Sequence, residues 1–261
     1  NKIAGDVENQ LNEFASLNED QQAQAKQIGL AAERWTHQVL LPRAANLIGQ
    51  VAQDVELTGA LKKNTYDAIV EFAYQPIALS QNHELIHDVA GLFYSMDARQ
   101  DEEVRAHLTE SYIKRRDKRD ERTLEKQKDG IAKSLKTLFR GMGVARERTD
   151  LDRMREVLEA RIDLGEQTNA FYTQTNEAFM ALTEDKGLDF DLFLQRYKEA
   201  WALLEAGPNS AHPEQFKYNA DNGFAALKIL FDSLNADEQI KAVSVLREYQ
   251  DFLLGLSVDS E

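Results

Sequence analysis

The chain has 261 residues, of which 43% are hydrophobic and 29% charged, a balance typical of a folded globular protein and too apolar for a disordered one. Its formal net charge of -14 argues against non-specific attraction to nucleic acid or anionic lipid. The absence of cysteine excludes disulfides, thiol catalysis and cysteine-ligated zinc. No apolar run approaches the roughly 20 residues that a bilayer-spanning helix needs.

Long helices are favoured over the frequent turns of an all-β fold, because only 4 prolines and 13 glycines interrupt the chain. Apolar residues recur at three- and four-residue spacing along most of the sequence. We therefore predict an all-α fold, with long antiparallel amphipathic helices in an extended or curved multi-helix bundle and no sheet. In chain order, the predicted helices cover residues 6–15, 18–41, 42–55, 66–73, 80–94, 97–141 (with an interruption at Gly130 left open), 150–182, 190–206, 216–231 and 240–256.

We predict a single helical domain over residues 1–261. A sub-boundary is suggested near residues 141–149, where Gly141 and Gly143 flank a methionine. Leu41-Pro42 is predicted to separate two helices, because proline fits the first position of a helix and disrupts its interior.

A short motif recurs at three predicted helix starts. Ser-Leu/Met-Asn/Asp begins at Ser16, Ser95 and Ser233, and each copy is followed within six residues by glutamine. Asn18 with Gln21, and Asp97 with Gln100, match the spacing of a capping box, in which two side chains satisfy each other's backbone N–H groups. Capping explains the Asn or Asp, but it does not require the glutamine, which leaves common descent of the helices as an alternative.

Charge is unevenly distributed along the chain. Residues 114–155 hold 15 Lys and Arg against 8 Asp and Glu, a local net of +7, so the remainder carries -14 - 7 = -21. We interpret this basic stretch as a solvated helix face; the alternative is a surface presented to an acidic partner.

The candidate metal site is His83-Glu84-Leu85-Ile86-His87, which matches the zinc peptidase motif H-E-x-x-H. Two histidines four residues apart lie on one face of a helix, where both can bind Zn²⁺ while the glutamate activates water. A zinc metallopeptidase with His83 and His87 as metal ligands and Glu84 as catalytic residue is therefore the alternative function.

Three observations count against this alternative. The third-ligand candidates Glu102, Glu103, His107 and Glu110 all lie on the next predicted helix, beyond the cap at Asp97. No strand pattern that could bind a peptide substrate lies nearby. The motif also falls in an early helical turn rather than inside a core helix. We therefore favour a protein without catalytic residues, cofactor or metal.

The other histidines, His37, His107 and His212, show no catalytic pattern, and His37 near Trp35 is interpreted as a packed or capped residue. There is no glycine-rich phosphate loop and no nucleophile elbow.

Several of these features together resemble an uncharacterised family of proteobacterial envelope lipoproteins. The resemblance rests on Ser16-Leu17-Asn18-Glu19-Asp20-Gln21, Trp35-Thr36-His37, Leu41-Pro42, the capped helix Met96–Gln100 leading to Arg115, Arg116 and Arg119, and the capped helix Leu234–Leu256. The Leu-x-x-x-Gln element is also similar to repeats in the small periplasmic chaperones Spy and CpxP, which cradle unfolded clients without ATP.

This resemblance implies a non-enzymatic protein of the periplasm, either free or anchored to the outer membrane as a lipoprotein. It would bind a protein or an envelope component through a helical surface. The similarity to Spy and CpxP adds the alternative that this binding is chaperone-like. Its contact with the membrane would be through an N-terminal lipid anchor, on a cysteine preceding Asn1. No nucleic-acid partner is expected.

Overall fold

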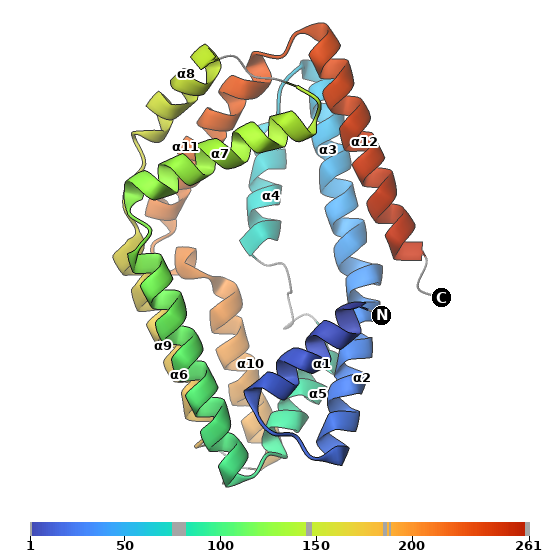
Figure 1. The fold of residues 1–261 in the computed structure, drawn as a ribbon, viewed down its shortest axis with the longest axis vertical. Coiled ribbons are helices and arrows are strands. Elements are labelled where there is room, and N and C mark those ends of the chain that lie inside the picture. Colours follow the sequence, from blue (N-terminus) through green and yellow to red (C-terminus); the bar gives the residue numbers. More distant parts are fainter. Residues whose placement is uncertain (1, 75–81, 145–147, 185–186, 188, 259–261) are drawn as a thin grey trace. The chain divides into compact units, whose positions relative to one another are not determined.

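A computed structural model describes residues 2–74, 82–144, 148–184, 187 and 189–258, and within these ranges the chain is helical with short connections and no strand (Figure 1). The all-α prediction is therefore confirmed. None of the helices in the described ranges is long and apolar enough to cross a membrane. The elements are α1 (Lys2–Phe14), α2 (Glu19–Trp35), the π-helical η1 (Thr36–Leu40), α3 (Leu41–Thr58), α4 (Lys63–Tyr74), α5 (His83–Tyr94), α6 (Ala98–Asp120), α7 (Leu124–Gly141), α8 (Arg148–Leu158), α9 (Gly165–Leu182), α10 (Phe190–Ala206), the 3₁₀ turn η4 (Pro208–Ser210), α11 (Pro213–Asp232) and α12 (Ala236–Val258).

The chain divides into two compact units, each assembled from three separate segments. Unit 1 comprises residues 1–36, 77–120 and 165–211, and it contains α1, α2, α5, α6, α9 and α10. Unit 2 comprises residues 37–76, 121–164 and 212–261, and it contains α3, α4, α7, α8, α11 and α12. The suggested sub-boundary at 141–149 lies inside unit 2, and residues 145–147 of it are outside the described part.

Capping boxes begin three helices, at the three copies of the recurring motif. Asn18 Oδ1 accepts from the backbone N of Gln21 at 3.0 Å, and the Gln21 side chain accepts from the backbone N of Asn18 at 3.0 Å. The same pair of bonds joins Asp97 to Gln100, at 2.9 Å each. In the third copy the partner is glutamate rather than glutamine: the Glu238 backbone N donates to Asn235 at 3.0 Å.

The glutamines that capping alone does not require are explained by a contact between two copies in unit 1. Gln100 Nε2 donates to Gln21 Oε1 at 2.7 Å and to the Ser16 carbonyl at 2.9 Å. Gln21 Nε2 donates in return to Gln100 Oε1 and to the Ser95 carbonyl, both at 3.2 Å. Both glutamines are buried. The two helix starts therefore fasten each other through a reciprocal amide pair, which we call the glutamine clasp.

Two predicted long helices are each divided in the structure. The predicted helix over 97–141 is interrupted at residues 121–123, where α6 ends and Thr123 caps α7, rather than at Gly130, which lies within α7. The predicted helix over 150–182 separates into α8 and α9. Asn219 of α11 fixes this break, because its side chain accepts from the Ile162 N at 3.0 Å and donates to the Ile162 carbonyl at 2.9 Å. These bonds replace the helical partners that Ile162 would otherwise use.

The boundary predicted at Pro42 is correct in position but different in form. A π-helical turn, η1, stands between α2 and α3, and Pro42 lies in the first turn of α3. Proline lacks an N–H group and its ring crowds the carbonyl four residues earlier, so the ordinary α-helical bond cannot form there.

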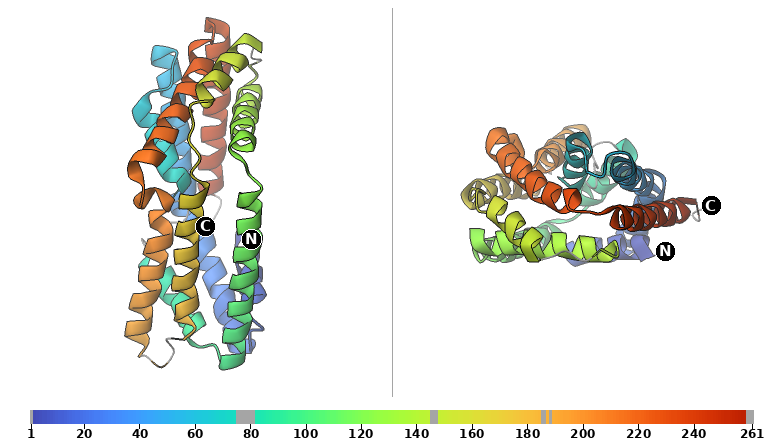
Figure 2. Two further views of the ribbon diagram at one scale, coloured as in Figure 1. Left: turned by 90° about the vertical axis from the view of Figure 1, so that its left-hand side faces the viewer. Right: turned by 90° about the horizontal axis from the view of Figure 1, so that it is seen from above.

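Each unit has its own apolar core. In unit 1 the core includes Ile28, Ile86, Leu92 and Phe193, and α1 crosses α2 closely at Gly29. A Cβ at Gly29 would lie 2.5 Å from the backbone oxygen of Ala4, which only a glycine tolerates. The left view of Figure 2 shows α6, α9 and α10 of unit 1 running side by side.

In unit 2, α12 packs along α3 and α11 along α8, around a core with Phe139, Met154 and Phe231. The buried carboxylate of Asp54 accepts from the Lys62 N at 3.1 Å and pairs with its ammonium at 3.0 Å. Burial opposes ionisation, but hydrogen bonds from Thr65 and Lys62 outweigh it and hold the pKa of Asp54 below its ordinary value.

Candidate functional site

The H-E-x-x-H motif occupies the first turns of α5. Asn82 caps this helix, since its side chain accepts from the Leu85 N at 3.1 Å. Glu84 and His87 are exposed. The side chain of His83 lies outside the described part of the structure, so the geometry between the two histidines stays untested.

The described members of the motif have neighbours that do not resemble a metal centre. His87 Nδ1 lies 3.5 Å from the carboxylate of Asp88, and its ring meets Phe190 edge to face at 5.2 Å. Within the described residues, no group of three or more His, Cys, Asp or Glu side chains is placed to hold a metal ion. The peptidase alternative stays a prediction that zinc analysis can test.

Two of the four third-ligand candidates contact other residues. Glu103 accepts from the backbone N of Ser16 at 2.6 Å, and the His107 ring packs on Phe14 with 4.4 Å between centroids. Glu102 and Glu110 are exposed on α6. The other histidines are also placed: His37 Nδ1 lies 2.6 Å from the Leu256 carbonyl near the end of α12, and His212 precedes α11.

A better candidate is a pocket of about 430 Å³ inside unit 1, a volume within the range of small-molecule sites. All six long helices of the unit contribute to its walls. Most of the lining is apolar or aromatic, and the core side chains that border it include Ile28, Leu85, Val89, Val104, Leu182 and Phe193.

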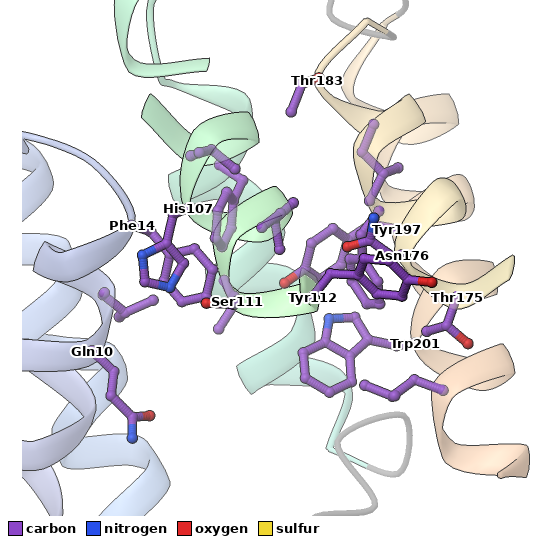
Figure 3. A pocket seen from close by; sticks show the side chains of 18 of the residues that line it. Gln10, Phe14, His107, Ser111, Tyr112, Thr175, Asn176, Thr183, Tyr197 and Trp201 are labelled. Atoms are coloured by element: carbon purple, nitrogen blue, oxygen red, sulfur yellow. The ribbon is translucent and has the colours of Figure 1, made fainter. Parts of the chain in front are cut away.

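Aromatic rings form one side of the pocket. The Trp201 ring meets Phe179 edge to face at 5.5 Å and lies 6.4 Å from Tyr197. Burial raises the pKa of the Tyr197 phenol above its ordinary value, so this hydroxyl stays protonated. Figure 3 shows Tyr197 and Trp201 close to Tyr112 and Asn176, with Phe14 and His107 paired on the side of α1. Such rings offer a large rigid contact area to an apolar ligand.

The register of α6 against α9 shows how the pocket extends along the helices. Near the start of α6, Arg105 Nε donates to Thr183 at 2.5 Å. Farther along, Tyr112 bonds to Thr173 at 2.6 Å, and near the end of α6 Arg119 Nε donates to Asn169 at 2.7 Å. The two helices are therefore antiparallel, and α6 side chains from Val104 to Arg119 line the pocket.

The end of the pocket near the end of α6 is basic. Arg115 and Arg119 both line it, and the Arg119 guanidinium lies over the Tyr172 ring at 4.7 Å. Its Nε is satisfied by Asn169, whose own amide donates to Asp120 at 2.7 Å. Its Nη2 is buried and makes no hydrogen bond with any residue that the structure describes. A buried donor without a partner is unusual and calls for an explanation.

The sequence pattern does not predict this pocket. It places Arg115 and Arg119 in the basic stretch, which is expected to form a solvated helix face. A signal did exist in the spacing: Val104, Leu108 and Tyr112 share a helical face with the two arginines. The pattern could not show that this face borders a cavity, because the opposing residues come from other segments of the chain.

Comparison of the chain with protein families, with curated proteins and with solved structures finds no match.

Proposed function

We propose that this protein is a non-enzymatic protein of the bacterial envelope, and that it binds an apolar part of another envelope component in the unit 1 pocket. The observation that carries the proposal is the pocket itself, which has a volume of about 430 Å³ and a lining that is mostly apolar or aromatic. Pockets of this size and lining are the usual form of small-ligand sites. The envelope location rests on the resemblance carried by Ser16–Gln21, Trp35–His37 and Leu41-Pro42.

Binding needs no chemistry from the pocket. Among the polar side chains that line it, Tyr112 and Thr175 are bonded within the protein, Tyr112 to Thr173 and Thr175 to the Phe171 carbonyl at 3.0 Å. Neither of these bonds joins a hydroxyl to a histidine or carboxylate base, as an activated nucleophile would require. These two groups therefore support a binding role over a hydrolytic one.

The test is to fill the pocket and measure binding of the neutral apolar dye Nile red by its fluorescence. Ser111 lines the pocket on α6, whereas Thr109 is exposed on the same helix outside it. We expect Ser111→Phe to weaken dye binding about tenfold, as expected for the loss of roughly 1.4 kcal/mol of contact energy, and Thr109→Phe to leave it unchanged. Equal binding by both variants would remove the pocket from the proposal.

Two further measurements distinguish this proposal from two other functions, a chaperone-like one and a metallopeptidase. If the pocket takes side chains of unfolded proteins instead, the protein will slow aggregation of a denatured client and Ser111→Phe will lose that activity. Zinc content near one ion per chain, in protein purified without chelator, together with peptidase activity lost in Glu84→Gln, would favour the metallopeptidase.

A further inference from the structure

The unit 1 pocket differs in character between its two ends. At one end Val104, Leu182 and Phe193 are each at least 93% buried. Arg115 and Arg119 lie at the other end, in the last turns of α6. From Val104 to Arg119 is fifteen residues of helix, or about 22 Å. The pocket residues thus run from a buried, largely apolar end, where Asp101 also lies, to a basic end over a length suited to an extended hydrocarbon chain.

The charges that line the pocket are separated in the same way. Among the described lining residues the single carboxylate is Asp101, in the first turn of α6. The two arginines lie near the opposite end of that helix. A ligand lying along the pocket would therefore meet positive charge at one end only.

Arg119 is held in place at the basic end of the pocket and has an N–H donor without a partner among the described residues. Stacking on Tyr172 and the bond from Nε to Asn169 fix the plane of its guanidinium. Its buried Nη2 still has no acceptor among the described residues. A fixed guanidinium with an unused N–H donor matches the geometry of carboxylate and phosphate oxygens.

We propose that the unit 1 pocket binds a single-chain amphiphile with an anionic head group, a long-chain fatty acid being the simplest example. The chain lies among the apolar side chains of α6, α9 and α10, and the head group accepts hydrogen bonds from Arg119, with Arg115 beside it. This inference rests on the proposed function, because it names the ligand class of the same pocket.

Trp201 provides a direct reporter for the test. The chain has two tryptophans, and Trp35→Phe leaves Trp201, which lines the pocket, as the only one. A fatty acid brominated in mid-chain quenches tryptophan emission on contact. The matched probe is the alcohol with the same brominated chain, which is neutral. We expect both to quench Trp201, and the acid to bind about tenfold more tightly, the equivalent of one charge-assisted hydrogen bond.

Arginine variants then locate the head group. Arg119→Gln should weaken the acid about tenfold and leave the alcohol within twofold. Arg116 provides the control, because it lies on the same helix, pairs with Asp117 and does not line the pocket, so Arg116→Gln should change neither probe. Arg115→Gln alters an exposed side chain, so we expect it to leave the fold intact and to weaken binding of the acid selectively.

The outcomes distinguish the two proposals. Equal affinity for acid and alcohol, or equal effects of Arg119→Gln and Arg116→Gln, would overturn the anionic ligand while leaving an apolar binding site. Absence of quenching by either probe would overturn both.

Discussion

Replacing Gln100 by alanine would open the glutamine clasp that joins two helix starts of unit 1. The Gln100 amide makes four hydrogen bonds: it accepts from the Asp97 N and from Gln21 Nε2, and it donates to the Ser16 carbonyl and to Gln21 Oε1. At about 1 kcal/mol net for each bond, with the buried Gln21 left partly unsatisfied, the loss is about 2–4 kcal/mol in the free energy of unfolding.

Urea unfolding followed by tryptophan emission is the suitable assay. Both tryptophans, Trp35 and Trp201, lie in unit 1, so emission reports that unit even if unit 2 unfolds separately. Gln22→Ala is the matched control: the Gln22 side chain is exposed and, within the described part of the chain, makes one hydrogen bond, to the Leu17 carbonyl at 3.0 Å. Its effect should stay within about 0.5 kcal/mol.

A double-mutant cycle tests the reciprocity itself. Because Gln21 and Gln100 bond to each other, the second alanine should cost much less than the first, with a coupling energy of about 0.5–3 kcal/mol. The reasoning would be refuted if the two effects simply add, or if Gln100→Ala costs no more than Gln22→Ala.

Three further predictions concern packing, pH and a helix break. Gly29→Ala should lower the stability of unit 1 by about 1–3 kcal/mol, because α1 must move away from the added Cβ. Gly5→Ala has open space around its Cβ position and should be neutral or stabilising by up to about 1 kcal/mol. The midpoints of urea unfolding of the two variants test this difference. Since the pKa of Asp54 is lowered by folding, its contribution is present above about pH 4 and lost below it. The stability deficit of Asp54→Asn, measured by circular dichroism, should therefore be largest above pH 4 and shrink as the pH falls; a constant deficit would contradict this. Asn219→Ala should lower the free energy of unfolding by about 1–3 kcal/mol and loosen the connection between α8 and α9. Trypsin should then cleave faster at Arg161. An unchanged cleavage rate would argue against the role of Asn219.

The sequence by itself determined the helical class and three of the helix starts. Both follow from short-range physics: apolar spacing selects helix over strand, and the capping side chains act within three residues of the backbone they satisfy. Asn18 with Gln21 and Asp97 with Gln100 could therefore be predicted from their spacing alone, and the structure confirms these caps.

Tertiary structure decided what local signals leave open. The break between α8 and α9 depends on Asn219, 57 residues beyond Ile162, and the burial of Gln21 depends on Gln100, 79 residues away. The pocket depends most on residues that are distant in the sequence. At its basic end, Arg119 of α6 is held in place by Tyr172 and Asn169 of α9. Whether an arginine faces solvent or borders a cavity is set by the segment that packs opposite it, and spacing along one helix does not contain that information.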